Sequence, residues 1–161
     1  MKKVMIIGNS GSGKSTFARK LQEKIHLPLY HIDMMYWTGK GTPVTRSWFK
    51  EKHRETIEKD EWIIDGNFSG TMESRMDACD TIIFLDYPTD VCLEGVRNRI
   101  GTKRPDIPWV EEKENPVFME YIRTYNEKVR PTVMEMIERH KDKRIIILHN
   151  REEADVLLKE V

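Results

Sequence analysis

The residues best suited to chemistry lie where an apolar run enters a glycine-rich turn. Residues 5–16 read M-I-I-G-N-S-G-S-G-K-S-T, which fits the phosphate-loop pattern G-x-x-x-x-G-K-[ST] between a strand and a helix. We expect Lys14 to reach the β- and γ-phosphates of ATP and the Ser15 hydroxyl to bind Mg²⁺. Successive backbone N–H groups at a helix amino terminus add a site for anions. The predicted ATP-binding residues are Gly8, Asn9, Ser10, Gly11, Ser12, Gly13, Lys14, Ser15 and Thr16.

Polar side chains follow several apolar runs at the edge of the sheet where this loop must lie. Asp33, Asp65, Asp86 and Asn150 each stand just beyond such a run. Carboxylates placed there suit Mg²⁺ positioning and acceptor binding, and we favour these roles for Asp33 and Asp65. Asp86 precedes Tyr-Pro-Thr and is interpreted as a turn or capping residue. His31 lies within a predicted strand, which favours a packing role over a catalytic one.

Arginines form the next candidate group, because guanidinium groups stabilise the negative charge that develops during phosphoryl transfer. Arg97, Arg99 and Arg104 lie at or in an irregular segment. Arg123 and Arg130 are seven residues apart, which places them on one helix face if the helix is continuous there. The five arginines together are a stronger indication of a phosphoryl-transfer site than any one of them alone.

Short, continuous apolar runs are typical of parallel strands covered on both faces, and helical patterns separate them. The predicted strands are residues 4–7, 29–32, 62–64, 81–85 and 144–148. One predicted helix follows the phosphate loop, a second runs from a Ser47 cap to about residue 59, and a third runs from a Thr89 cap to about residue 100. A fourth covers residues 118–129, and a fifth covers residues 133–140 beyond a kink at Pro131. The last predicted helix ends the chain. This alternation predicts one α/β domain over residues 1–161, with helices on both faces of a parallel sheet.

Two stretches interrupt the alternation and are predicted to be loops. Residues 37–46 are rich in Gly, Thr and Pro, and residues 101–116 carry three prolines and mixed charge. Long loops in compact domains are usually functional or disordered. We interpret residues 97–116 as a mobile lid over the phosphates and residues 33–75 as the acceptor-binding region.

Composition excludes some function classes. The 27 basic and 27 acidic residues give zero net charge, which argues against a nucleic-acid partner. Cys79 and Cys92 have no partners at metal-ligand spacing. The first apolar run is too short for a signal peptide or a membrane span, so a cytoplasmic protein with a small-molecule partner and no membrane is expected, as a monomer or homodimer.

Several segments resemble a known family. The phosphate loop, W-I-I-D-G-N-F at 62–68, I-I-F-L-D-Y-P at 82–88, R-N-R-I at 97–100 and R-T-Y-N-E-K-V-R-P at 123–131 are similar to nucleoside monophosphate kinases, adenylate kinases especially. H-I-D-M-M-Y-W at 31–37 and D-G-N-F-S-G-T at 65–71 more closely resemble small P-loop proteins known as adenylate-kinase-related or DNA topology modulation proteins. The resemblance covers nearly the whole chain.

The resemblance implies a P-loop NTPase fold of three layers, with strand order 2-3-1-4-5 and a short lid. It implies that Asp65 acts on Mg²⁺ through water. It also implies that catalytic arginines join Lys14, and that a late loop holds the adenine ring. The residues matched to these last two roles are Arg97, Arg99, Arg123 and Arg130 for catalysis, and Asn150 and Arg151 for adenine.

One departure from the family bears on the acceptor. Adenylate kinases bind the acceptor phosphate with the arginine of D-G-F-P-R, whereas residues 65–69 here read D-G-N-F-S. Arg75 is the candidate substitute. The predicted acceptor-binding residues are Asp33, Asp65, Gly66, Asn67 and Arg75.

Three functions remain open at this point. The first is an ATP-dependent phosphotransferase whose acceptor is a nucleoside monophosphate. The second is a kinase of a small hydroxylated metabolite, of the shikimate or gluconate type, in which Asp33 is the general base. The third is an ATP-binding regulator linked to DNA topology, which fits poorly with zero net charge.

Overall fold

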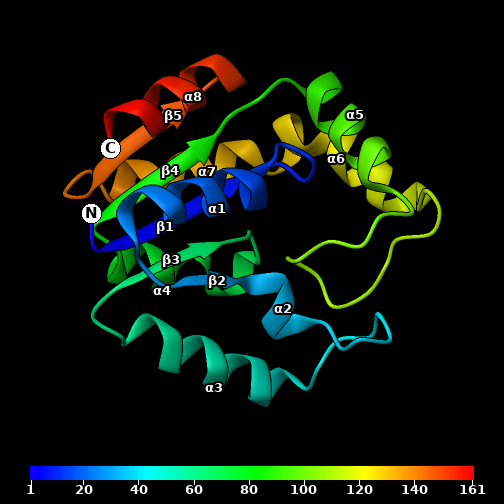
Figure 1. Ribbon diagram of the computed structural model, residues 1–161, viewed down its shortest axis with the longest axis horizontal. Coiled ribbons are helices and arrows are strands. Elements are labelled where there is room, and N and C mark those ends of the chain that lie inside the picture. Colours follow the sequence, from blue (N-terminus) through cyan, green and yellow to red (C-terminus); the bar gives the residue numbers. More distant parts are fainter.

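A computed structural model describes residues 1–161, and a five-stranded parallel sheet forms its centre (Figure 1). The strands are β1 (Lys3–Gly8), β2 (Leu29–His31), β3 (Trp62–Asp65), β4 (Thr81–Leu85) and β5 (Arg144–Leu148). Their order is β2-β3-β1-β4-β5, with every pair parallel, which confirms the predicted fold class and strand order.

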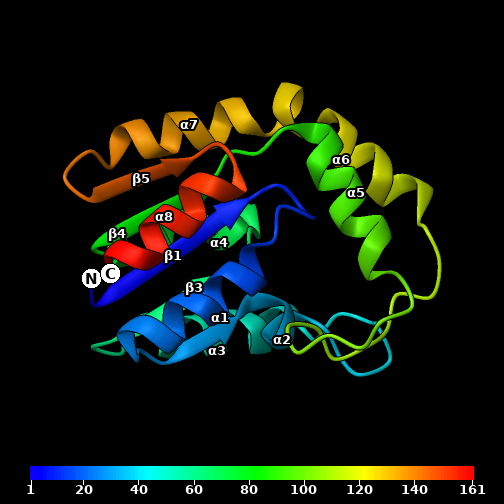
Figure 2. The ribbon, with the colours of Figure 1, turned by 45° about the horizontal axis from the view of Figure 1, so that its top comes forward.

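Eight helices connect and cover the strands. They are α1 (Lys14–Ile25), α2 (Ile32–Tyr36), α3 (Arg46–Ile57), α4 (Ser69–Ala78), α5 (Thr89–Arg99), α6 (Pro116–Lys128), α7 (Arg130–Arg139) and α8 (Arg151–Glu160). Figure 2 shows helices on both sides of the sheet, with α1 and α8 on one side and α7 on the other. The chain therefore forms three layers.

Alternation along the strands divides the core into two parts. Val4 and Ile6 of β1 point to the face covered by α1, α5, α6 and α8, and Met5 and Ile7 point to the face covered by α2, α3, α4 and α7. All four side chains are fully buried. Burial on both faces is why these strands read as continuous apolar runs.

Helix boundaries differ from the sequence expectation in physically simple ways. Helix α3 is capped by the Thr45 hydroxyl, which accepts a hydrogen bond from the Trp48 N–H, so the expected Ser47 cap is wrong. Helix α5 has no side-chain cap and begins at Thr89 itself, after Pro88. Pro131 lies in the first turn of α7, where its missing N–H costs nothing.

The break between α6 and α7 affects a predicted site. Helix α6 ends at Lys128 and α7 begins at Arg130. Arg123 and Arg130 therefore belong to different helices, and the condition for placing them on one face is not met. Helices α2 and α4 were not expected, and β2 ends at His31, so Asp33 belongs to α2 rather than to a strand end.

The pairing of His53 with Arg75 predicts a pH-dependent stability. His53 on α3 is buried, and its Nε2 lies 3.4 Å from an Arg75 guanidinium nitrogen on α4. Burial, together with the Arg75 charge, lowers the pKa of His53 to about 4. In the unfolded chain the His53 imidazole binds a proton below about pH 6.5, whereas in the folded chain it stays neutral down to about pH 4. The contribution of His53 to the free energy of unfolding is therefore complete above about pH 6.5 and is lost as the pH falls towards 4.

We expect the free energy of unfolding to fall between pH 7 and 5 by at most about 1.4 kcal/mol per pH unit from this group. Urea denaturation at both pH values measures the loss, and His53→Gln should show a smaller loss. Equal losses in the two proteins would contradict the prediction.

Candidate active site

The phosphate loop connects the carboxyl end of β1 to the amino terminus of α1. Gly11 and Gly13 have φ angles of 82° and 89°, which favour glycine. The Asn9 carbonyl accepts hydrogen bonds from the N–H and hydroxyl of Ser12 and, at 3.0 Å, from the Lys14 ammonium. The Asn9 side chain also donates to the Ile122 carbonyl, which ties the loop to α6.

Lys14 is a partly buried cation at the bottom of this loop. Burial lowers its pKa, and Asp65 is the carboxylate that most strongly opposes this shift. A buried ammonium group is costly unless negative charge compensates it. The loop therefore fits a polyphosphate anion, which would supply that charge.

Asp65, the last residue of β3, connects the phosphate loop to the edge of the sheet. One carboxylate oxygen accepts a hydrogen bond from the Ser15 hydroxyl at 2.5 Å, and the other lies 2.5 Å from Nδ1 of His31. His31, for which the sequence favoured a packing role over a catalytic one, thus contacts a predicted site residue. Nothing in its spacing indicated this contact, which depends on the pairing of β2 with β3.

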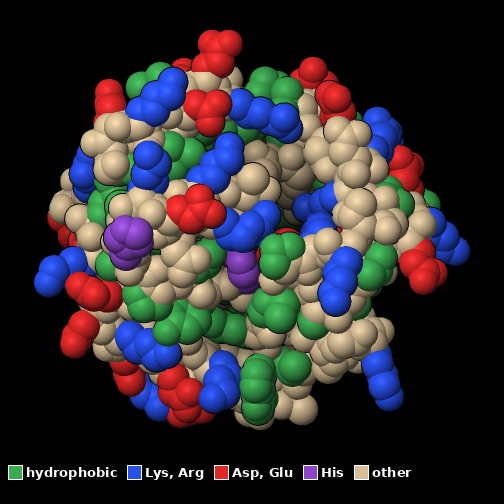
Figure 3. All heavy atoms as spheres, in the orientation of Figure 1, with side chains coloured by type: hydrophobic (Ala, Val, Ile, Leu, Met, Phe, Trp, Pro, Cys, Tyr) green, Lys and Arg blue, Asp and Glu red, His purple; other side chains and the backbone are tan.

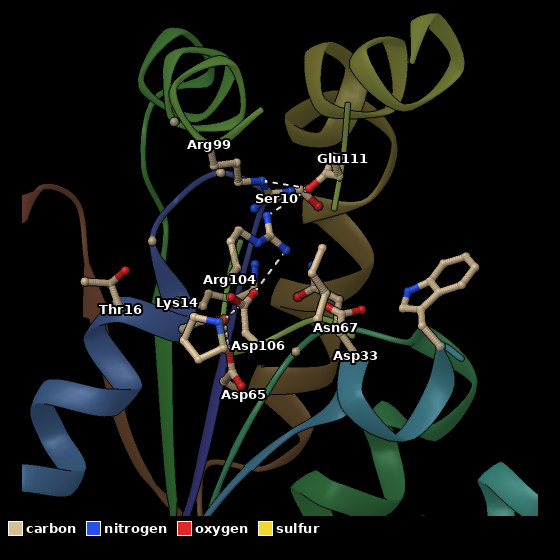
Figure 4. Close-up of a pocket in the computed structure, with 18 of the residues that line it drawn as sticks. Ser10, Lys14, Thr16, Asp33, Asp65, Asn67, Arg99, Arg104, Asp106 and Glu111 are labelled. Carbon is tan, nitrogen blue, oxygen red and sulfur yellow. Dashed lines mark hydrogen bonds and ion pairs between the residues drawn. The ribbon is translucent and has the colours of Figure 1, made fainter. Parts of the chain in front are cut away.

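The lid, residues 97–116, brings two further carboxylates to the site (Figure 4). The Asp106 carboxylate lies 3.2 Å from the Ser15 hydroxyl oxygen, whose single proton is closer to Asp65, and it accepts a 3.1 Å hydrogen bond from Arg104. Arg104 also donates to Glu111 at 2.9 Å, and Arg99 lies 3.2 Å from the same carboxylate. Two lid arginines are thus paired with two lid carboxylates.

These elements enclose a cavity of about 760 Å³. Lys14 and Asp65 lie at its base, and Asp33 lines it from the first turn of α2. Burial raises the pKa of the Asp33 carboxyl, Lys14 opposes this shift, and Asp65 adds to it. The predicted site residues that line the cavity are Ser10, Gly11, Gly13, Lys14, Ser15, Thr16, Asp33, Asp65, Gly66, Asn67, Arg99 and Arg151.

Eight predicted residues do not line this cavity: Gly8, Asn9, Ser12, Arg75, Arg97, Arg123, Arg130 and Asn150. The last four of these make their contacts outside it. Arg97 pairs with Glu114 and Arg123 with Glu120, each about half exposed at the surface. Arg130 forms two hydrogen bonds to Asp86, at 2.8 and 2.7 Å. The fourth residue, Asn150, caps α8 by accepting a hydrogen bond from the Glu153 N–H.

The side chains of two predicted acceptor-binding residues form hydrogen bonds with backbone groups. Asn67 exchanges hydrogen bonds with Gly8, donating to its carbonyl at 2.7 Å and accepting from its N–H at 3.2 Å. Arg75 is fully buried and donates to the carbonyl groups of Gly66 and Asn67 and to the Thr71 hydroxyl. Its guanidinium therefore holds the chain after β3 and does not line the cavity.

Several residues at the site were not expected from the sequence. Asp106, Glu111 and Trp109 line the cavity but carried no motif, whereas Trp37, which also lines it, belongs to the quoted motif at 31–37. Gly95 of α5 packs so closely on the phosphate loop that an added Cβ would lie 2.1 Å from the Gly11 carbonyl oxygen. Only the contact between two distant segments identifies it.

The donor set fits Mg²⁺ in the way phosphate-binding enzymes use it. Ser15 and Asp65 offer oxygen atoms, and Mg²⁺ is usually bound by one or two protein groups together with phosphates and water. No group of three or more His, Cys, Asp or Glu side chains is arranged to hold a metal ion by itself. None of the helices is both long and apolar enough to cross a membrane.

No model of a known protein family matches the chain. One curated relative, the uncharacterized protein YqaC of Bacillus subtilis (strain 168), is 32% identical over 105 residues. The match covers 61% of this chain and only 56% of that relative.

Solved structures share the whole fold. A shikimate kinase from Acinetobacter baumannii, in complex with shikimate, has a TM-score of 0.63 and 15% identity, and the match covers 99% of this chain and 90% of that one. A shikimate kinase from Bacteroides thetaiotaomicron has a TM-score of 0.60 and 18% identity, with coverage of 98% and 94%. A gluconokinase from Sinorhizobium meliloti 1021 has a TM-score of 0.57 and 14% identity, and the match covers 99% of this chain and 92% of that one.

These likenesses place the chain in the P-loop kinase fold. The motifs had suggested a narrower resemblance to nucleoside monophosphate kinases, and the solved structures named here instead carry the names of shikimate and gluconate kinases.

The close approach of Gly95 to Gly11 predicts a selective loss of nucleotide binding. In Gly95→Ala the new Cβ would displace the phosphate loop from α5, and we expect ATP affinity to fall at least about tenfold. Gly70→Ala is the matched control, because nothing lies within 4 Å of its added Cβ. Calorimetric titration with ATP measures both, and equal affinities would contradict the prediction.

Proposed function

We propose that this protein transfers the γ-phosphoryl group of Mg-ATP to a hydroxyl group of a small acceptor. The observation that carries the proposal is the cavity in which the Asp33 carboxylate faces the same space as Lys14 and the phosphate loop. A donor phosphate held by Lys14 and an acceptor hydroxyl near Asp33 would meet there.

The phosphate loop, with Lys14, would hold the triphosphate. Ser15 would bind Mg²⁺ and Asp65 would orient it through water; when bound, the ion neutralises phosphate charge. A second cavity, of about 270 Å³, lies between α1 and α8 beside the phosphate loop, and Tyr87 and Arg151 line it. Arg151 lines both cavities, so they adjoin, and the adenine ring would occupy the second.

Asp33 would act as the general base. The acceptor oxygen attacks the γ-phosphorus, the bond from that phosphorus to the bridging oxygen of ADP breaks, and the hydroxyl proton passes to Asp33. Arg99 and Arg104 lie where guanidinium groups could stabilise the charge on the transferring group. The lid would exclude water, which competes as an acceptor.

A nucleoside monophosphate acceptor is the weaker candidate. Its phosphate oxygen is already anionic and needs no base, and it requires a cation to bind that phosphate. Arg75, the substitute expected from the sequence, is fully buried against backbone carbonyls. The fold neighbours whose names include shikimate and gluconate kinases also favour a hydroxyl acceptor.

A regulator linked to DNA topology has no observation in its favour. Basic and acidic side chains are interspersed on the face shown in Figure 3, and the net charge is zero. DNA-binding proteins instead concentrate basic residues on one face.

Acceptor-stimulated formation of ADP tests the proposal. We expect Mg-ATP turnover to rise with one hydroxylated compound, and Lys14→Ala to abolish the rise because the triphosphate loses the cation of the phosphate loop. Lys24→Ala, an exposed change on the same helix, should behave like the wild type. Stimulation by nucleoside monophosphates alone would contradict the hydroxyl acceptor.

The raised pKa of Asp33 predicts the pH profile. A base must be ionised, so kcat/KM should fall as pH drops through the pKa of Asp33, at a pH above the ordinary aspartate value of 3.8. Asp33→Asn should lower kcat by at least about 100-fold and remove this acidic limb. Asp60→Asn, a control at an exposed aspartate, should keep the wild-type kcat and the acidic limb of the profile. An active Asp33→Asn protein with an unchanged profile would rule out Asp33 as the base.

A further inference from the structure

The part of the cavity around Asp33, which we call the acceptor side, is acidic and aromatic. Asp33, Trp37, Asn67, Phe68 and Trp109 line it. Asn67 already exchanges two hydrogen bonds with Gly8, so its amide is occupied. Asp33 is therefore the ionisable group that an acceptor would meet first.

The basic side chains near the acceptor side are already engaged. Arg75 is fully buried against carbonyl oxygens. Arg104 is paired with Asp106 and Glu111, and Arg99 is paired with Glu111. These four lid side chains are mostly shielded from solvent, and their charges balance.

Four other cations line the cavity, namely Lys14, Arg19, Lys103 and Arg151. Arg19 donates a 3.3 Å hydrogen bond to the Thr16 hydroxyl of its own helix, and Arg151 also lines the second cavity, so both belong to the nucleotide side. Lys14 is bonded to the Asn9 carbonyl at the base of the phosphate loop, where a triphosphate would use its charge. Lys103 also lines the cavity, but it is exposed on the lid. An acceptor carboxylate or phosphate would therefore enter beside Asp33 without a buried cation to pair with it, which is unfavourable.

The two indole rings offer a different kind of recognition. Trp37 and Trp109 meet edge to face, with centroids 6.0 Å apart at 69°. Both residues line the cavity, and their ring faces would cover apolar C–H groups of a ligand.

We propose that the acceptor is a neutral polyhydroxyl compound, bound by Asp33 through a hydroxyl group and covered by Trp37 and Trp109. This inference rests on the proposed phosphotransferase function. It separates the chain from kinases whose acceptors are carboxylic acids or phosphate esters, because those acceptors need a free cation at this position.

The first test compares matched acceptors that differ in one anionic group. The pairs are glucitol and gluconate, methyl shikimate and shikimate, and adenosine and AMP. In each pair that supports ADP formation from Mg-ATP, the neutral member should have a kcat/KM at least about tenfold higher. A higher value for an anionic member in any such pair would overturn the inference.

Binding is measured separately, so that a failed proposed function can be recognised. Tryptophan fluorescence in the presence of Mg²⁺ and a non-hydrolysable ATP analogue reports ligands near Trp37 and Trp109. A neutral member that changes the fluorescence without stimulating turnover supports this inference and contradicts the phosphotransferase proposal. If no neutral member binds, or anionic members bind more tightly, the inference is wrong.

A charge variant tests the reason for the preference. Glu111→Gln leaves Arg99 and Arg104 without their shared carboxylate, so the anionic member of each pair should gain affinity relative to the neutral one. Glu112→Gln removes an exposed charge outside the cavity and should leave the ratio of affinities unchanged. An unchanged ratio in Glu111→Gln would contradict the claim that Glu111 withholds these cations.

Discussion

The Asp65 carboxylate is the group on which the arrangement of the site depends. It ends the buried strand β3, accepts a hydrogen bond from Ser15 of the phosphate loop and contacts His31 at the end of β2. Parallel pairing in the order β2-β3-β1 brings these segments together at one edge of the sheet. A nearly buried carboxylate is stable there because polar partners surround it, and the same partners fix the position of the phosphate loop.

Two arginines and two carboxylates of the lid balance one another's charge before any ligand binds. Arg104 connects Asp106 to Glu111, while Asp106 also reaches the Ser15 hydroxyl. The lid is thus bonded to the phosphate loop through a carboxylate that lies where ligand oxygens would come. Binding of a polyphosphate beside Ser15 would exchange the contact between Asp106 and Ser15 for a contact with the ligand. Such an exchange is a simple physical basis for lid movement.

Local patterns predicted the parts of the structure that depend on neighbouring residues. Continuous apolar runs indicated all five strands, and the spacing of Gly8, Gly13, Lys14 and Ser15 indicated the phosphate loop. The sequence could not show Gly95 against Gly11, or Asp106 at Ser15, because these contacts join segments about 80 to 90 residues apart. Arg75 was misplaced for a similar reason: its partners are the carbonyl groups of a turn that carries no sequence signal.

Calorimetric titration with a non-hydrolysable ATP analogue, with Mg²⁺ and with EDTA, shows whether the phosphate loop and Asp65 form a Mg-ATP site. We expect one site per chain, with tighter binding in the presence of Mg²⁺ and little effect of Mg²⁺ in Ser15→Ala. That pattern would show that the Ser15–Asp65 contact marks a Mg-ATP site. Absence of binding by the folded wild-type protein, or binding that Mg²⁺ leaves unchanged, would contradict the account.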